Sequence, residues 1–130
     1  MAKTNPWAQI KEKASAIVPP VTVLREQAQL LSEATNAVIQ GTVIVESSGG
    51  DTVTHKLRAY VPALDNYSVD LLTVQHSMLI YPCSLWCSFD DRRKWVECEN
   101  KDQLEAAVQF ALELDAVQKV VVSLMSQATQ

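Results

Sequence analysis

The sequence predicts an α+β domain of two layers, in which an antiparallel sheet of about five strands, arranged as a meander, is covered on one face by N-terminal and C-terminal helices. Three observations support this prediction. Apolar residues recur at helical spacing before residue 41 and after residue 100. Residues 42–99 are rich in β-branched side chains and alternate in polarity, and turn-forming residues divide them into short runs. The length of 130 residues fits one domain, residues 1–130.

Two helices are expected in the N-terminal part of the chain. Asn5-Pro6 suits the start of a short helix, and Pro19-Pro20 ends it, because the residue before a proline avoids helical angles. The apolar residues of this helix share one face: Trp7, Ile10, Ala14 and Ile17. A longer helix is expected from Thr22, as its N-cap, to Gln40, with a wide apolar face that suits packing on a sheet. Gly41 then stands where a left-handed helix terminator is expected.

The extended region begins with a predicted hairpin. Its two runs, residues 42–47 and 52–61, flank the turn cluster Ser48–Asp51. This cluster lacks the Gly-Lys-Ser/Thr ending of a phosphate-binding loop, so we interpret it as a turn. One face of the second run carries Val53, His55, Leu57, Ala59 and Val61. The opposite face carries Thr54, Lys56, Arg58 and Tyr60.

The stretch Asn66–Pro82 is the longest run that favours buried, extended structure, and we expect it to supply the two central strands. Its first half alternates Tyr67, Val69 and Leu71 with Ser68, Asp70 and Leu72. A turn near Gln75–Ser77 is expected to separate this strand from a second one at Met78–Tyr81, and one long bent strand fits the same residues. Ser84–Phe89 either extends the second strand or leaves the sheet.

The last third of the chain returns to helical spacing. Asp90–Arg93 is typical of an exposed turn, and Lys94–Glu99 of a final strand whose glutamates face solvent. Asn100 or Asp102 is expected to open an amphipathic helix, and Asp115 a second one. Three consecutive valines in that second helix favour a strand locally, but the apolar spacing continues through them.

Composition restricts the function and the location. The formal net charge of −4, from 11 basic and 15 acidic residues, argues against nucleic-acid binding, for which the face with Lys56, Arg58 and Tyr60 is the candidate surface. The N-terminal residues lack the apolar segment of a signal peptide, and no run is long enough to span a membrane. An odd count of three cysteines fits a reducing compartment. We therefore expect a cytoplasmic protein without a membrane partner.

The potential metal or catalytic residues are His76, Cys83, Cys87 and Cys98. Cysteines four positions apart on a strand lie about 13 Å apart, which is too far to share an ion or to form a disulfide. Nothing in the sequence brings a thiol and an imidazole together, and His55 is interpreted as a structural strand residue. We predict no metal, no cofactor and no catalytic residue. The alternative hypothesis is a small enzyme or metal-binding protein that uses His76 with Cys83 or Cys87.

Aromatic and charged side chains concentrate around residues 86–95. The predicted partner-binding residues are Trp86, Phe89, Arg92, Arg93 and Trp95, because Trp and Arg are enriched at protein interfaces. A solvated turn whose tryptophans pack inward is the alternative. In size, acidity and mix of elements the chain resembles small secretion chaperones, antitoxins and immunity proteins. The sequence thus predicts a non-enzymatic, acidic protein-interaction module (an adaptor, chaperone or inhibitor) whose partner is another protein. A homodimer is also expected, because the apolar helix faces are large for one small sheet.

Overall fold

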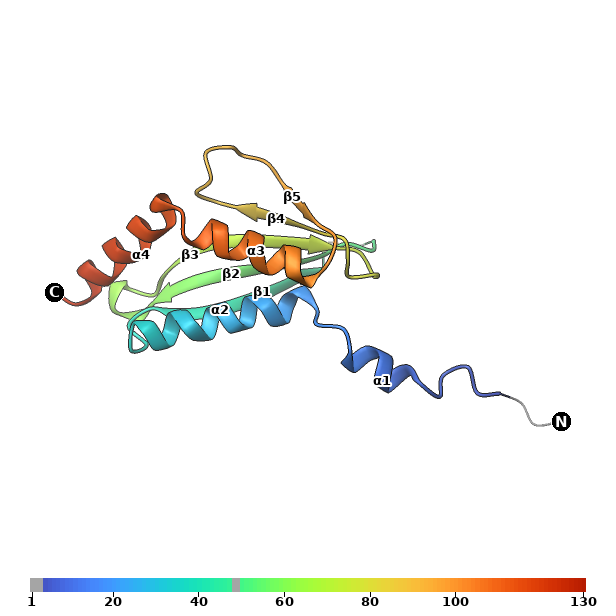
Figure 1. Cartoon of the computed structure of the whole chain (residues 1–130). Helices are drawn as coiled ribbons and strands as arrows, with labels where there is room; N and C mark the ends of the chain where they lie inside the picture. The colour runs from blue at the N-terminus through green and yellow to red at the C-terminus, as the bar shows by residue number, and fades with distance from the viewer. Residues whose placement is uncertain (1–3, 48–49) are drawn as a thin grey trace.

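The computed structural model describes residues 4–47 and 50–130, and within them it shows one five-stranded antiparallel sheet with the order β1-β2-β3-β4-β5 (Figure 1). Helices α2 and α3 lie on the same face of this sheet, which confirms the predicted α+β meander. The strands are β1 Gln40–Ser47, β2 Val53–Val61, β3 Tyr67–His76, β4 Cys83–Cys87 and β5 Val96–Cys98. The helices are α1 Ile10–Ser15, α2 Pro20–Ala34, η1 Pro62–Leu64, α3 Lys101–Leu112 and α4 Asp115–Ala128.

Strand β2 shows how alternation sorts side chains between the two faces of the sheet. Leu57, Ala59 and Val61 are fully buried beneath the helices. Lys56 and Arg58 lie on the opposite, open face. The register confirms the predicted hairpin, because Ser47 pairs with Val53. Residues 48 and 49 of its predicted turn lie outside the described residues.

A β-bulge in β3 corrects the predicted alternation of that strand. Leu57 pairs with Leu72, whereas Arg58 pairs with Asp70, so Leu71 has no partner in the register. The extra residue lets two consecutive leucines, Leu71 and Leu72, both be buried in the core. The simple period of two that the sequence suggested therefore changes phase at this point.

The strand predicted at Met78–Tyr81 is wrong. Residues 77–82 form the turn between β3 and β4, in which Ile80 has a φ of 74°. Met78 and Leu79 are 80 % and 83 % exposed, so their apolar character does not reflect burial. The second central strand is β4, which begins at Cys83, and residues 84–87 of the ambiguous segment belong to it.

Helix α2 begins two residues before the predicted Thr22 and ends six residues before the predicted Gln40. Pro20 is its first residue, and it ends at Ala34, where the Thr35 hydroxyl accepts a hydrogen bond from the Ile39 N–H (3.1 Å). Gly41 is not a helix terminator, because it lies inside β1. A side chain at this position would clash with the backbone of Ala28 in α2, so the glycine is required by the close approach of helix and strand.

The termini behave differently from each other. Helix α1 covers only part of the predicted segment, buries no residue, and projects away from the sheet (Figure 1). The N-terminal contribution to the helical layer therefore comes from α2. In the C-terminal part, the Asn100 side chain accepts a hydrogen bond from the Gln103 N–H and so caps α3. Of the two predicted starting residues, Asn100 is therefore the N-cap and Asp102 is not. Helix α4 continues through the three valines as expected.

Candidate functional site

The loop of residues 88–95 joins β4 to β5 and separates two surfaces. On the open face of the sheet, Trp86 and Trp95 pack together with ring centroids 5.5 Å apart. They line one end of a shallow groove of about 410 Å³ that continues across polar side chains of neighbouring strands. The other groove-lining residues are Glu46, Thr54, Lys56, Thr73 and Gln75.

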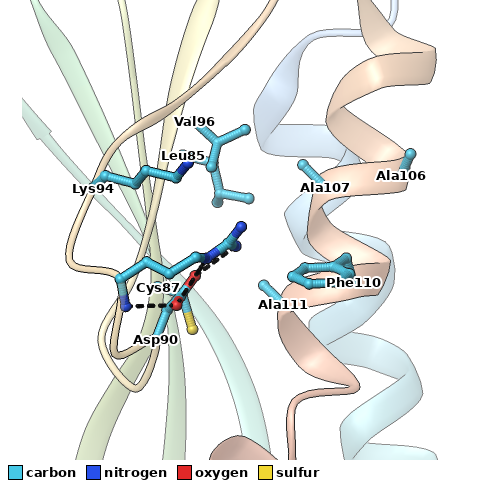
Figure 2. Close-up of a pocket in the computed structure, with 10 residues that line it drawn as sticks. Leu85, Cys87, Asp90, Lys94, Val96, Ala106, Ala107, Phe110 and Ala111 are labelled. Atoms are coloured by element: carbon cyan, nitrogen blue, oxygen red, sulfur yellow. Dashed lines mark hydrogen bonds and ion pairs between the residues drawn. The ribbon is translucent and has the colours of Figure 1, made fainter.

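On the helical side of the same loop, a cleft opens between the β4–β5 hairpin and α3 (Figure 2). We call it the β4–α3 cleft. Its volume is about 330 Å³, which lies at the lower end of the range typical of ligand pockets. Most of its lining is apolar, and its charged groups come from the loop. The lining residues are Leu85, Cys87, Asp90, Arg92, Lys94, Val96, Ala106, Ala107, Phe110 and Ala111.

The charges of the cleft are not balanced. Arg92 forms an ion pair with Asp90 (Nη2 to Oδ2, 2.8 Å), and this hydrogen-bonded pair lowers the pKa of the Asp90 carboxyl. The Arg92 guanidinium also lies 5.1 Å from the ring centroid of Phe110, a cation–π distance. Lys94 forms no ion pair with any residue that the structure describes, and its side chain extends toward Leu85 and Val96 (Figure 2). The cleft can therefore accept an apolar group that carries a negative charge.

The five predicted partner-binding residues are divided between these surfaces. Trp86 and Trp95 lie on the open face, whereas Arg92 lies in the β4–α3 cleft. Phe89 is half-buried and packs against the core, and Arg93 is exposed with a φ of 50°.

Sequence reasoning did not select Lys94 or Phe110. Phe110 is 55 % exposed although it belongs to an amphipathic helix. The sequence could have drawn attention to Phe110, because it is an aromatic residue that lies outside the apolar face of α3 formed by Leu104 and Val108. Lys94 gave no such signal, because only the fold places it beside Leu85 and Val96.

The surface considered for nucleic-acid binding is already neutralised. Arg58 pairs with Asp70 (Nε to Oδ1, 2.7 Å), and Lys56 pairs with Glu46 (3.4 Å). The Tyr60 hydroxyl donates to the Asn66 side chain. Because both cations already have carboxylate partners, this face offers little free positive charge for a phosphate backbone.

The fold brings part of the predicted His–Cys set together. His76, Cys83 and Cys98 are neighbours in one row across β3, β4 and β5, whereas Cys87 lies opposite Leu72, at the other end of β4. Within the described residues, no group of three or more His, Cys, Asp or Glu side chains is arranged to hold a metal ion. A side-chain hydrogen bond with Cys98, together with burial, raises the pKa of the Cys83 thiol. A protonated, buried thiol is a poor nucleophile.

A histidine pair lies at the same end of the sheet. His55 Nε2 is 2.8 Å from His76 Nε2. His76 Nδ1 lies 2.7 Å from the Ser77 carbonyl oxygen, which can only accept, so neutral His76 receives a hydrogen bond from His55 at Nε2. His55 Nδ1 is buried and has no partner among the described residues. Burial, His76 and Arg25 lower the pKa of His55, so the His55 imidazole resists protonation and its contact with His76 is structural.

Comparison of the chain with protein-family models, with curated proteins and with solved structures finds no match. No helix in the described part of the chain has the length and apolar character needed to cross a membrane. The functional assignment therefore depends on the geometry of the molecule.

Proposed function

We propose that this chain is a non-enzymatic, acidic protein-interaction module of the cytoplasm, and that another protein docks at the loop of residues 88–95 and its β4–α3 cleft. The observation that carries the proposal is the combination of an apolar cleft with a cation at its rim, Lys94, that forms no ion pair with the described residues. The expected partner segment presents an apolar side chain next to a carboxylate. The side chain fills the space beside Leu85 and Val96, and the carboxylate pairs with Lys94.

Two exposed aromatic side chains add to the docking surface: Phe110 lines the cleft, and Trp95 lies on the other side of the loop, on the open face of the sheet. Phe110 is 55 % exposed and Trp95 is 43 % exposed. Roughly 100 Å² of each would leave water on binding, which corresponds to about 2–3 kcal/mol per residue before the costs of association. Aromatic side chains of this kind often dominate the free energy of an interface. The ion pair with Asp90 orients the Arg92 guanidinium within the loop, and the cation–π contact of Arg92 with Phe110 joins the loop to α3, so the surface is pre-organised.

The test compares two charge reversals in affinity capture from native lysate at low salt. Lys94→Glu removes the rim cation of the β4–α3 cleft, whereas Lys119→Glu makes the same change on an exposed position of α4. We expect a stoichiometric protein that is retained by the wild type and by Lys119→Glu and is lost with Lys94→Glu. The absence of any stoichiometric protein, or equal retention by both variants, would refute the proposal.

A Phe110→Ala variant tests the contribution of the exposed aromatic ring separately from that of the Lys94 charge. Phe110 is exposed, so the substitution leaves the core intact. If the partner covers this ring, the dissociation constant should rise by more than about tenfold. Leu79→Ala, which removes a more exposed apolar side chain from the β3–β4 turn, should leave the dissociation constant unchanged.

A further inference from the structure

The N-terminal arm, residues 4–17, carries apolar side chains that no other described residue of the chain buries. All of its residues are exposed, and α1 buries none of them. Trp7 is 71 % exposed and Ile10 is 48 % exposed. A helix of six residues is not stable by itself in water, so a surface that receives its apolar face would stabilise it.

The root of the arm is held firmly. The Tyr81 hydroxyl donates a hydrogen bond to the Val18 carbonyl oxygen (2.7 Å), and Val18 packs against the core. Pro19, with φ −71° and ψ 157°, and the buried Pro20 restrict the backbone that follows. The arm therefore leaves the domain in a defined direction, away from the sheet and from α2 (Figure 1).

A groove that suits this arm lies beside the C-terminal half of α2. The groove between α2 and α4 has a volume of about 280 Å³ and is lined mainly by apolar side chains, including Leu30, Ala34, Leu112 and Val121. Leu30 is 54 % exposed, so the groove opens onto solvent. Leu30 lies ten residues, or about 15 Å, along α2 from Pro20, where the arm departs in the opposite direction. The groove is therefore better placed for the arm of another molecule than for the arm of the same chain.

Charge favours the same pairing. The arm contains two basic residues and one acidic residue, whereas residues 18–130 contain eight basic and 14 acidic residues, a formal net charge of −6. The positively charged arm of one copy is thus attracted to the negatively charged residues 18–130 of another copy. In the chain, Glu113 directly follows the groove-lining Leu112, and Asp115 lies two residues before the groove-lining Val117. We infer that each copy of this chain inserts Trp7 and Ile10 into the α2–α4 groove of a second copy, forming a dimer by reciprocal exchange of arms.

The first test measures the oligomeric state of the full chain by light scattering over about 1–100 µM. We expect a dimer for the wild type and, for the double variant Trp7→Ala, Ile10→Ala, a dissociation constant more than about tenfold higher. Leu30→Lys in the groove should have the same effect. Gln9→Ala, outside the apolar face of the arm, is the matched control and should remain dimeric. All four positions are exposed in the single chain, so none of these variants should impair folding.

The second test identifies the contact. A photo-crosslinking amino acid replaces Ile10 in a mixture of unlabelled and ¹⁵N-labelled protein, and cross-linked peptides are identified by mass spectrometry. Cross-links between light and heavy chains, mapped to α2 and α4, are expected. A strict monomer, a dimer insensitive to both the arm and groove variants, or cross-links confined to one chain would each overturn the inference. So would a monomer whose arm binds vesicles of mixed neutral and anionic phospholipid. Lys94 and Phe110 do not line this groove, so failure here is distinguishable from failure of the proposed partner site.

Discussion

Replacing Gly41 by alanine should strongly destabilise the protein. A Cβ on Gly41 would lie 2.5 Å from the Cα of Ala28 and closer still to the Ala28 carbonyl oxygen. Both atoms belong to the backbone of α2, so no side chain can rotate to relieve the clash. The helix would have to move, which would disturb the hydrogen bonds of Ser32 to the Gly41 N–H (2.9 Å) and to the Ala28 carbonyl oxygen (3.1 Å).

The magnitude follows from the rigidity of this contact. Overpacking of a well-packed site typically costs about 1–3 kcal/mol, and a clash with backbone alone belongs at the upper end of that range. We expect Gly41→Ala to lower the free energy of unfolding by about 3 kcal/mol. In urea denaturation this corresponds to a midpoint lower by about 1.5 M. Gly50→Ala is the control: Gly50 has a φ of 69° but open space around it, so only about 1 kcal/mol of backbone strain is expected.

A second substitution distinguishes packing from backbone conformation. If Gly41 were needed for a left-handed conformation, asparagine would be tolerated better than alanine. Because the structure places Gly41 in a strand pressed against α2, asparagine should cost at least as much as alanine. A Gly41→Asn variant more stable than Gly41→Ala, or a Gly41→Ala variant as stable as the wild type, would refute this reasoning.

Three further predictions concern buried polar groups. Because the pKa of His55 is lowered in the folded state, the unfolded chain takes up the proton first; the urea midpoint should therefore fall as the pH drops through about 6.5, and His55→Leu should flatten this dependence. A pH-independent wild type would contradict the assignment. Thr35→Val should lower the free energy of unfolding by about 1–3 kcal/mol, measured by urea denaturation, because the Ile39 N–H loses its acceptor; Thr35→Ser, which keeps the hydroxyl, should cost less. Iodoacetamide should modify buried Cys83 and Cys87 far more slowly in the native protein than in urea, as mass spectrometry would show, and rapid native labelling of either thiol would revive the catalytic alternative.

The elements that the sequence predicted well are those with a strong local period. Alternation in β2 and helical spacing in α3 survive in the structure because each pattern commits one face of its element to the core. Met78–Tyr81 was misassigned for the complementary reason. Its residues are apolar, but an apolar run carries no information about whether a turn will leave it in solvent. The bulge at Leu71 was equally invisible, since it is defined only by the register with the neighbouring strand.

The candidate site was predictable only in part. Local composition drew attention to the loop of residues 88–95, because Trp and Arg are enriched at protein interfaces. It did not show that this loop has two sides, with Trp95 on the open face of the sheet and Arg92 in a cleft against α3. Phe110 enters the site from an element that follows β5, so its contact with Arg92 depends on how α3 packs on the sheet.

For elements such as β2, α3 and α4, the sequence by itself determined the type of element and which face is apolar, since these depend on neighbours a few positions away. Tertiary structure decided what those faces meet: Gly41 against Ala28, His55 against His76, and Lys94 beside an apolar cleft without a carboxylate to pair with among the described residues. These pairings join residues from different elements. Their geometry depends on register and packing, which local spacing does not encode.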